Sequence, residues 1–453
     1  MGRKFISSTL CSQYEIVNDI LETALEAVDP YLCTRKFIKM NQSRLEIGQK
    51  VLLLNEIENI YVIGTGKAVL PMTKAVYDAL GSLIKGGVII GKHADRQTMD
   101  QLPASIEILF GDHPIPTEKS LESAKRLADF STRMTKNDLV ICLISGGGSS
   151  LMTLPVEPIS LADMQAVTRQ LLFSGATINE VNAVRKHLDK IKGGGLARMI
   201  WPAKLATLVL SDVIGDSLDA IASGPTVADP STFSDVLQIV QRYQIEKKIP
   251  ENVIGIIKNG ADGMIPETVK EGDKCLLDAH TFIIGSLQLA IDAAGQRANQ
   301  AGIHTHIYSS EITGEAREIG AQLASKFLQL IEEKRSEHKP MLLIAGGETT
   351  VTVKGNGKGG RNQETALSAA LQIKGRQSCL FISLATDGED GPTDAAGAAV
   401  NGWTIAEGSA LDMKAEDYLA RNDAYNYLDR VGSLIRIGPT GTNVNDLVFV
   451  FNF

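Results

Sequence analysis

Two kinds of apolar segment follow each other along the chain. One is a short continuous run of apolar residues, and the other is a longer stretch in which apolar residues recur at helical spacing. The runs are rich in Val, Ile and Leu, and most are followed by glycine; they lie at 60–64, 88–90, 106–110, 139–145 and 205–212. Such runs are typical of buried parallel strands, and the amphipathic stretches between them are typical of crossover helices. The pattern predicts an α/β fold with a parallel sheet covered on both faces, whose ligands bind at the carboxyl ends of the strands.

The same reasoning assigns local elements to the N-terminal half. A helix is expected over 12–28, where Asp29 and Pro30 stop it, and a second helix is expected over about 44–54. Thr117 follows a proline-rich turn and is expected to cap a helix. A basic helix begins near Asn179 and is expected to end at the glycines 193–195.

The C-terminal half follows a different pattern. Residues 234–340 read as mostly helical, with a short strand at 304–308. From Met341 the sequence predicts two strands joined at Gly346 and Gly347, then a helix over 361–373 and a strand over 380–387. The last residues are expected to form a hairpin-like pair of strands around 438–445.

Composition and charge narrow the class of protein. The chain has 453 residues, is 44% hydrophobic and carries a net charge of −8, with no run of five Lys or Arg. These values argue against nucleic-acid and polybasic membrane binding. No stretch approaches 18 apolar residues, and the N-terminus lacks the apolar core of a signal peptide. Five single cysteines indicate neither a disulfide framework nor a cysteine zinc site, and Cys142 reads as a core residue. A cytoplasmic protein is the expectation.

Three glycine-rich or basic segments are candidates for binding anions. GTGKA (64–68) contains Gly64 and Gly66 and places Lys67 near a helix N-terminus, which attracts negative charge. SGGGSS (145–150) follows a buried strand and offers backbone N–H groups and hydroxyls; its residues are Ser145, Gly146, Gly147, Gly148, Ser149 and Ser150. Lys192 belongs to a basic helical segment, for which a solvated face is an equally good interpretation.

Two further segments supply carboxylates and another glycine pattern. Asp212 ends a predicted strand, where a base or metal ligand is well placed, although Asp also caps helices and begins turns. Gly355, Gly357 and Gly360 match GxGxxG, but Lys358 and Arg361 suit a terminal phosphoryl group better than a dinucleotide. Asp387, in an Asp- and Gly-rich loop, is a candidate Mg²⁺ ligand, with an Asx turn as the alternative.

Taken together, these segments indicate a phosphate-handling α/β enzyme, and the chain resembles the type II glycerate kinases with a C-terminal MOFRL domain. The resemblance rests on eight stretches that occur in order: GTGKA (64–68), GDHPIPTEKS (111–120), LISGGGSSLM (143–152), NAVRKHLDKIKGGGLA (182–197), LSDVIGDSLDAIASGPTVAD (210–229), GGETTVTVKGNGKGGRNQE (346–364), ATDGEDGPTDAAGA (385–398) and GPTGTNVNDL (438–447). They cover nearly the whole chain. Thr117 and Leu287 depart from residues common in the family, which puts a ligand contact at Leu287 in doubt.

The resemblance implies a fold, an activity and a set of site residues. It implies a Rossmann-like N-terminal domain and a smaller C-terminal α/β MOFRL-like domain, with the active site in the cleft between them. With the helical interpretation of the middle segment, the expected division is 1–240, a mostly helical connection over 241–340, and 341–453. It implies transfer of a phosphoryl group from ATP, with Mg²⁺, to D-glycerate, giving 2-phosphoglycerate. Lys67, Arg361 and Asp212 match the family's proposed catalytic residues.

Two alternatives stay open at this point. Members of the family have also been labelled hydroxypyruvate reductases, which would use NAD(P)H and fit the GxGxxG pattern. A non-catalytic metabolite or nucleotide sensor would keep the glycine loops but should lack the cationic pair of Lys67 and Arg361, and both are present. A homodimer is the expected oligomeric state.

Overall fold

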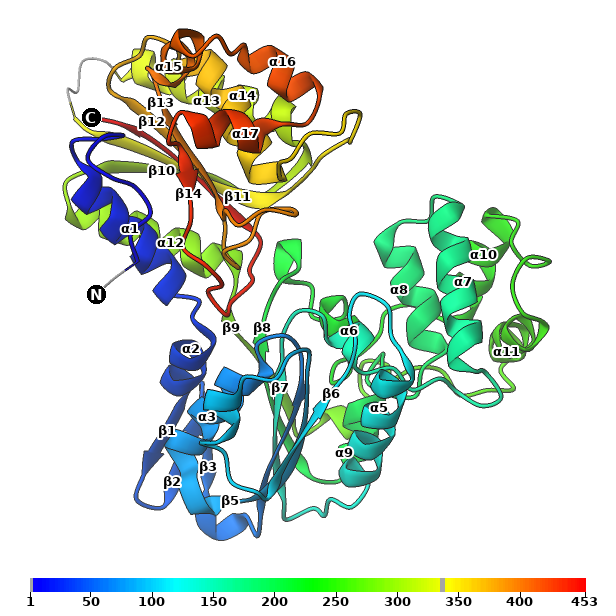
Figure 1. Ribbon diagram of the computed structural model, residues 1–453. Coiled ribbons are helices and arrows are strands. Elements are labelled where there is room, and N and C mark those ends of the chain that lie inside the picture. Colours follow the sequence, from blue (N-terminus) through cyan, green and yellow to red (C-terminus); the bar gives the residue numbers. More distant parts are fainter. Residues whose placement is uncertain (1–2, 335–338) are drawn as a thin grey trace. The chain divides into compact units, whose positions relative to one another are not determined.

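The computed structural model describes residues 3–334 and 339–453, and the chain divides into two compact units. Unit 1 comprises Met1–Asp29 and Gly285–Phe453, and unit 2 comprises Pro30–Ile284. The polypeptide therefore begins in unit 1, passes through all of unit 2 and returns (Figure 1). Each unit contains a six-stranded sheet with helices on both faces, so the predicted α/β class is confirmed.

The sheet of unit 2 has the strand order β6-β5-β4-β7-β8-β9. Its pairings of β4 with β5 and β7, of β5 with β6, and of β7 with β8 are parallel. This is the strand order of Rossmann-like sheets. The first three strands are added toward one edge of the sheet and the next three toward the other, so the order reverses between β4 and β7. The strands are β4 (Ile60–Thr65), β5 (Ile84–Gly91), β6 (Ile106–Phe110), β7 (Leu139–Ile144), β8 (Lys204–Leu210) and β9 (Ala279–Gly285).

Helices cover both faces of this sheet because its central strands are buried on both sides. All six residues of β7 are buried, including Cys142, as predicted. Helix α3 (Val69–Leu80) lies on one face, and α5 (Glu118–Ser131) and α9 (Gly195–Ile200) lie on the other (Figure 1). Thr117 is the N-cap residue of α5, as predicted. Shorter helices in this unit are α2 (Pro30–Phe37), α4 (Arg96–Met99) and α6 (Gly148–Leu151).

The predicted helix over 44–54 is wrong, because this segment belongs to a small antiparallel sheet. Its strands are β1 (Ile38–Asn41), β2 (Arg44–Ile47) and β3 (Lys50–Leu53). Leu45 and Ile47 are buried and their neighbours are not, which is the period of a strand. Gly48 has φ +57° between β2 and β3, a conformation that permits the tight turn and ends any helical pattern.

Four helices of unit 2 form a separate packed group. They are α7 (Leu161–Phe173), α8 (Ile178–His187), α10 (Phe233–Arg242) and α11 (Glu251–Ala261), and their apolar faces share one buried cluster (Figure 1). Helix α8 ends at His187, earlier than predicted. The glycines at 193–195 do not stop it; Gly194 is instead the N-cap residue of α9.

The sheet of unit 1 has the order β10-β11-β15-β12-β13-β14. Only the β10–β11 pairing is parallel among its recorded pairs. The strands are β10 (His304–Glu315), β11 (Met341–Thr350), β12 (Cys379–Ala385), β13 (Gly397–Asn401), β14 (Leu434–Ile435) and β15 (Asp446–Asn452).

Two strand predictions in unit 1 are wrong. Residues 341–350 form one continuous strand rather than two strands joined at Gly346 and Gly347. The final segment is not a hairpin, because β14 pairs with β13 whereas β15 lies between β11 and β12. A pairing between segments far apart in sequence leaves no local signal of its register.

Helices also cover both faces of the unit 1 sheet. Helices α13 (Ala316–Glu333) and α14 (Arg361–Ile373) pack on one face, and α12 (Leu287–Gln300) and α1 (Tyr14–Glu26) lie on the other (Figure 1). Three short helices complete the unit: α15 (Thr404–Ala410), α16 (Ala415–Ala420) and α17 (Ala424–Arg430). None of the helices among the described residues combines the length and apolar character needed to cross a membrane.

The segment expected to be a helical connection is divided between the two units. Strand β9 is the edge strand of the unit 2 sheet, while α12, β10 and α13 are integral parts of unit 1. Residues 241–340 therefore do not form a separate body, and the division by contacts differs from the 1–240, 241–340 and 341–453 division expected from the sequence.

Candidate active site

Two predicted anion loops meet in unit 2 at the point where the strand order reverses. The GTGKA segment follows β4, and the SGGGSS segment, hereafter the 145–150 loop, follows the adjacent β7. The Lys67 backbone N–H donates to the Gly146 carbonyl oxygen at 2.9 Å. The Ala68 N–H donates to the Ser145 hydroxyl at 3.0 Å. Ligands of open α/β sheets bind at this place.

Glycine in the 145–150 loop lets Asp212 and Lys67 approach the backbone. A Cβ atom at Gly146 would lie 2.2 Å from Oδ2 of Asp212. Gly147 has φ +83°, and a Cβ atom there would lie 3.4 Å from Cγ of Lys67. Asp212 follows β8, so three neighbouring strands bring a cation, a carboxylate and a glycine loop together.

The Gly146 and Gly147 N–H groups have no acceptor among the residues that the structure describes. Unpaired backbone donors at the end of a parallel strand suit an anion such as a phosphate. The predicted grouping of Gly66, Lys67, the 145–150 loop and Asp212 is therefore present as one cluster in unit 2.

The remaining glycines and the serines of this cluster hold its shape. Gly64 packs against β7, where a Cβ atom would lie 2.5 Å from the Leu143 carbonyl oxygen, and a Cβ atom at Gly148 would lie 2.9 Å from Thr65. The Ser149 hydroxyl lies 2.8 Å from that of Ser223. The Ser150 hydroxyl donates to the Pro114 carbonyl oxygen at 2.7 Å. These hydroxyls are engaged with protein, so the backbone is the better candidate for ligand contact.

His113 lies beside this cluster and was not identified from the sequence. A Cβ atom at Gly147 would come within 3.2 Å of its imidazole Cδ2. Burial, with Lys67 and Lys92 nearby, lowers the pKa of His113 to about 4. The ring is therefore neutral near pH 7 and does not add to the positive charge of Lys67. The only sequence signal was its place in GDHPIPTEKS, which contains no metal or triad pattern.

Lys192 lies apart from the anion loops. Its side chain is fully buried, and its ammonium donates to Asp189 at 2.6 Å and to the Met152 carbonyl oxygen at 2.9 Å. Burial lowers the pKa of Lys192 to about 8, although Asp189 acts in the opposite direction. These partners make Lys192 part of the core of unit 2, with no access for a phosphate.

Arg361 is placed in unit 1, at the first position of α14. Its guanidinium makes a two-point contact with Asp446, with Nε to Oδ2 at 2.6 Å and Nη2 to Oδ1 at 3.1 Å. Nη1 also donates to Glu348 at 2.8 Å. Burial opposes the charged guanidinium, but the attraction of Asp446 and Glu348 outweighs it and raises the pKa of Arg361. The arginine is thus fixed in orientation, and two carboxylates offset its charge.

A third carboxylate, that of Asp390, lies at the start of α14. It accepts from the backbone N–H groups of Asn362 at 3.1 Å and Gln363 at 2.9 Å. Burial raises the pKa of Asp390 to about 7, and Asp446 acts in the same direction. A Cβ atom at Gly360 would lie 2.3 Å from the Asp390 carboxyl carbon. Gly360 is therefore required for the approach of this carboxylate rather than for contact with a ligand.

The loop 354–360, which carries the GxGxxG pattern, forms backbone hydrogen bonds with residues 421–423 of unit 1. The N–H groups of Lys354 and Gly355 donate to Asn422, at 2.7 and 3.0 Å. Gly357 N–H donates to the Arg421 carbonyl oxygen at 3.0 Å, and Lys358 N–H donates to Asp423 at 3.0 Å. The expectation that Gly357 and its neighbours present these donors to a phosphate does not fit this geometry.

Asp387 follows β12 and forms the turn that was the alternative to metal binding. Its Oδ1 accepts from the Glu389 N–H at 3.1 Å. Within residues 3–334 and 339–453, no three His, Cys, Asp or Glu side chains gather in a way that could hold a metal. Mg²⁺ that enters with a nucleotide typically needs only one or two protein carboxylates, so a single half-buried carboxylate is compatible with it.

Comparison with known proteins adds two family matches. Residues 16–258 match a family described as a domain of unknown function, DUF4147. Residues 341–446 match the MOFRL family. Together these matches include Lys67, Asp212 and Arg361.

Individual relatives extend over almost the whole chain. A glycerate 2-kinase of Pyrococcus horikoshii is 41% identical over 436 residues, covering 96% of each chain. A crystal structure of a glycerate kinase from Thermotoga maritima superposes with a TM-score of 0.85 at 38% identity, covering 97% of this chain and 99% of that one. A putative hydroxypyruvate reductase of Agrobacterium vitis is 39% identical and covers 85% of each chain.

Proposed function

We propose, because the chain belongs to the glycerate kinase family that carries a MOFRL domain, that it phosphorylates D-glycerate. The donor is ATP, the acceptor is the C2 hydroxyl, and the products are 2-phosphoglycerate and ADP. The observation that carries this proposal is the cluster in unit 2, where Lys67 and Asp212 lie against a glycine loop. The Gly146 and Gly147 N–H groups of this loop have no acceptor within residues 3–334 and 339–453.

Each part of this cluster meets one need of phosphoryl transfer. The reaction gains most from positive charge and backbone donors that are fixed where the equatorial oxygens of the transferring group develop charge. Lys67 and the Gly146 and Gly147 N–H groups supply these interactions. Asp212 accepts a hydrogen bond from the C2 hydroxyl and orients its oxygen toward the γ-phosphorus, taking its proton as the bond forms.

The residues of unit 1 have more limited roles in this proposal. Arg361 is held rigidly by Asp446 and Glu348, so it would act as an oriented donor rather than as a mobile cation. Asp387 would supply one carboxylate to Mg²⁺, which neutralises phosphate charge when bound. Lys192 and Gly357 are left out of the proposed contacts, since their polar groups are engaged with the protein.

A paired assay on the purified chain tests the proposal. D-glycerate and Mg·ATP are followed for ADP release, and the position of the new phosphate is assigned by ³¹P–¹H NMR. Glycerate-dependent ADP release with phosphate on C2 is the expected result. Release of ADP with phosphate on C3 would keep the kinase activity and reject the proposed acceptor oxygen.

The same preparation, assayed with hydroxypyruvate and either NADH or NADPH, tests the alternative that the chain is a hydroxypyruvate reductase. The name of the Agrobacterium relative is the observation that favours it. Against it, the backbone donors of the 354–360 loop are already paired with residues 421–423. Oxidation of the nicotinamide without ADP release would reject the kinase proposal. The cytoplasmic location and the homodimer stay predictions.

A further inference from the structure

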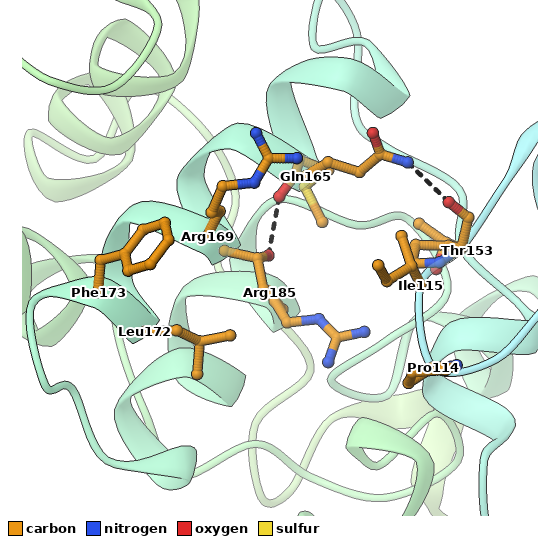
Figure 2. A pocket seen from close by; sticks show the side chains of 11 residues that line it. Pro114, Ile115, Thr153, Gln165, Arg169, Leu172, Phe173 and Arg185 are labelled. Carbon is orange, nitrogen blue, oxygen red and sulfur yellow. Dashed lines mark hydrogen bonds between the residues drawn. The ribbon is translucent and has the colours of Figure 1, made fainter.

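A cavity of about 420 Å³ adjoins the 145–150 loop in unit 2. Its walls come from the turn 114–116, from Thr153 and from helices α7 and α8. Figure 2 shows Ile115 and Thr153 on one side of the cavity and Leu172 and Phe173 on the other, with Arg185 between them. The volume falls within the range of roughly 300–1,000 Å³ that is usual for small-molecule sites.

The walls of this cavity include large apolar side chains that are exposed to solvent. Ile115 is 64% exposed, Leu172 57% and Phe173 81%. Three large apolar side chains around one concave surface are a feature of binding sites rather than of ordinary protein surface.

Two guanidinium groups line the same cavity. Arg185 donates to the Ser149 carbonyl oxygen at 3.3 Å, while Arg169 lies on the exposed side of α7. Among the described residues, no carboxylate forms an ion pair with either group. Burial lowers the pKa of Arg185, but a guanidinium remains charged at neutral pH. Asp189 attracts Arg185 without a direct ion pair among the described residues. Two arginines placed in this way beside apolar walls suit a ligand that has both an aromatic face and negative charge.

Two residues that line the cavity contact the loop that carries the proposed phosphate site. Arg185 contacts the carbonyl of Ser149, and Pro114 accepts the hydroxyl of Ser150 at 2.7 Å. Lys67 and His113 approach Gly147, two residues before Ser149 in the same loop. A ligand lying along the loop would thus place an apolar part in the cavity and an anionic part at Gly146 and Gly147.

We infer that this cavity receives the base and ribose of the phosphoryl donor, with the base between Ile115 and Leu172 and the phosphates directed to the 145–150 loop. The inference rests on the proposed function in taking a nucleotide as the donor. Of the two substrates, only the nucleotide has a planar ring to bury; glycerate has no apolar surface that would use these walls.

Calorimetric titration of the full chain with ADP and, separately, with pyrophosphate tests the inference. The two probes share a diphosphate and differ in the nucleoside. Thr168→Trp, which fills the cavity from α7, should weaken ADP binding by at least about 10-fold and change pyrophosphate binding by less than about 2-fold. Ile178→Trp is the matched control, because Ile178 is 64% exposed on α8 and does not line the cavity.

A milder variant guards against misfolding. Leu172→Ala removes one exposed wall and should weaken ADP binding by about 3-fold, whereas Ile178→Ala should leave it unchanged. Equal weakening of ADP and pyrophosphate, or unchanged ADP binding in both cavity variants, would overturn the inference.

The outcomes separate this inference from the proposed function. A chain that binds ADP through the cavity but does not phosphorylate glycerate would retain the inference and reject the function. A chain that phosphorylates glycerate with a KM for ATP unaffected by Thr168→Trp would retain the function and reject the inference.

Discussion

The 145–150 loop and the 354–360 loop have similar glycine-rich compositions and opposite environments. In the first, the N–H groups of Gly146 and Gly147 have no acceptor in the part of the chain that the structure describes, and Asp212 and Lys67 lie against the backbone. In the second, the N–H groups of Gly355 and Gly357 donate to residues 421–422, which pack where a Cβ atom would lie. We propose that glycine leaves room for a ligand in the first loop, whereas in the second it allows two segments of unit 1 to pack together.

The comparison shows what a glycine pattern alone can indicate. It marks a place where something approaches the backbone closely, but it does not say whether that partner is a ligand or the protein itself. The two cases are distinguished by where the backbone donors are directed. Substitutions should therefore affect activity at the first loop and stability at the second.

The largest effect is expected for Lys67→Ala. Removing the cation beside Gly147 should lower kcat by about 10²–10³-fold, because the charge on the transferring phosphoryl group loses its fixed partner. Circular dichroism should report an intact fold. Lys74→Ala is the control, since Lys74 lies on α3, the helix that follows Lys67, and forms an ion pair with Asp78. Near-wild-type turnover in Lys67→Ala would reject its role.

Arg361→Ala should lower both activity and stability. Turnover should fall by at least about 10²-fold if the oriented guanidinium contacts the reacting groups. The buried Asp446 would also lose its partner, at a cost of about 3–5 kcal/mol in the free energy of unfolding. Denaturant unfolding measures the second effect.

Arg436→Ala is the control for Arg361→Ala, because its pairs with Asp394 and Asp429 are exposed and should contribute less than about 1 kcal/mol. A stable Arg361→Ala variant would contradict the importance of the Asp446 contact. A destabilised variant with unchanged kcat would make Arg361 purely structural.

Gly146→Ala should impair catalysis with little loss of stability. The new methyl group would displace the Asp212 carboxylate, and a shift of about 1 Å can cost up to about 10²-fold in rate. Steady-state kinetics of Gly146→Ala, Asp212→Ala and the double variant test this. The double variant should be no worse than Asp212→Ala, and additive losses would show that Gly146 acts by another route.

Gly360→Ala should lower stability and leave the binding of ATP unchanged. Its methyl group would meet the buried carboxyl of Asp390 and lower the free energy of unfolding by about 1–3 kcal/mol. The KM for ATP should stay at the wild-type value in the fraction that is folded. A raised KM without a lower Tm would mean that the 354–360 loop binds the nucleotide, and the contrast between the loops would be lost.

The smallest effect is expected from His113→Gln. The folded-state pKa of His113 is about 4, below its ordinary 6.5, so the unfolded chain binds more protons between these values. His113 therefore makes stability rise with pH from about 4 to 6.5, and it adds no slope above that range. The Tm difference between about pH 5 and about pH 7.5 should be smaller in His113→Gln. An equal or larger difference would contradict the assignment.

Much of the unit 2 sheet could be predicted from the sequence because its signals are local. Strands such as β4 and β7 are continuous apolar runs that end at glycine, and the ends of parallel strands bring Lys67, Gly146 and Asp212 together by topology alone. The segment 44–54 was misassigned because its apolar spacing fits a helix as well as two short strands, and only the turn at Gly48 distinguishes them.

The errors in unit 1 arise from contacts between distant segments. The position of β15 between β11 and β12 and the packing of residues 421–423 on the 354–360 loop both depend on tertiary structure, which no local pattern encodes. Lys192 illustrates the same limit for the site. Its partner Asp189 is three residues away in the sequence, but only the burial of both side chains distinguishes a core ion pair from a ligand-binding lysine.

Because unit 1 is built from two segments separated by unit 2, its parts are synthesised at different times. Helix α1 buries Ile20, Leu21 and Leu25, and its packing partner α12 lies on the far side of residues 30–284. At about 5–20 residues per second, the ribosome needs on the order of tens of seconds to make that segment. During this interval unit 2 can fold, while the apolar face of α1 has no partner from its own unit. We therefore expect a chaperone to bind the apolar face of α1 during this interval.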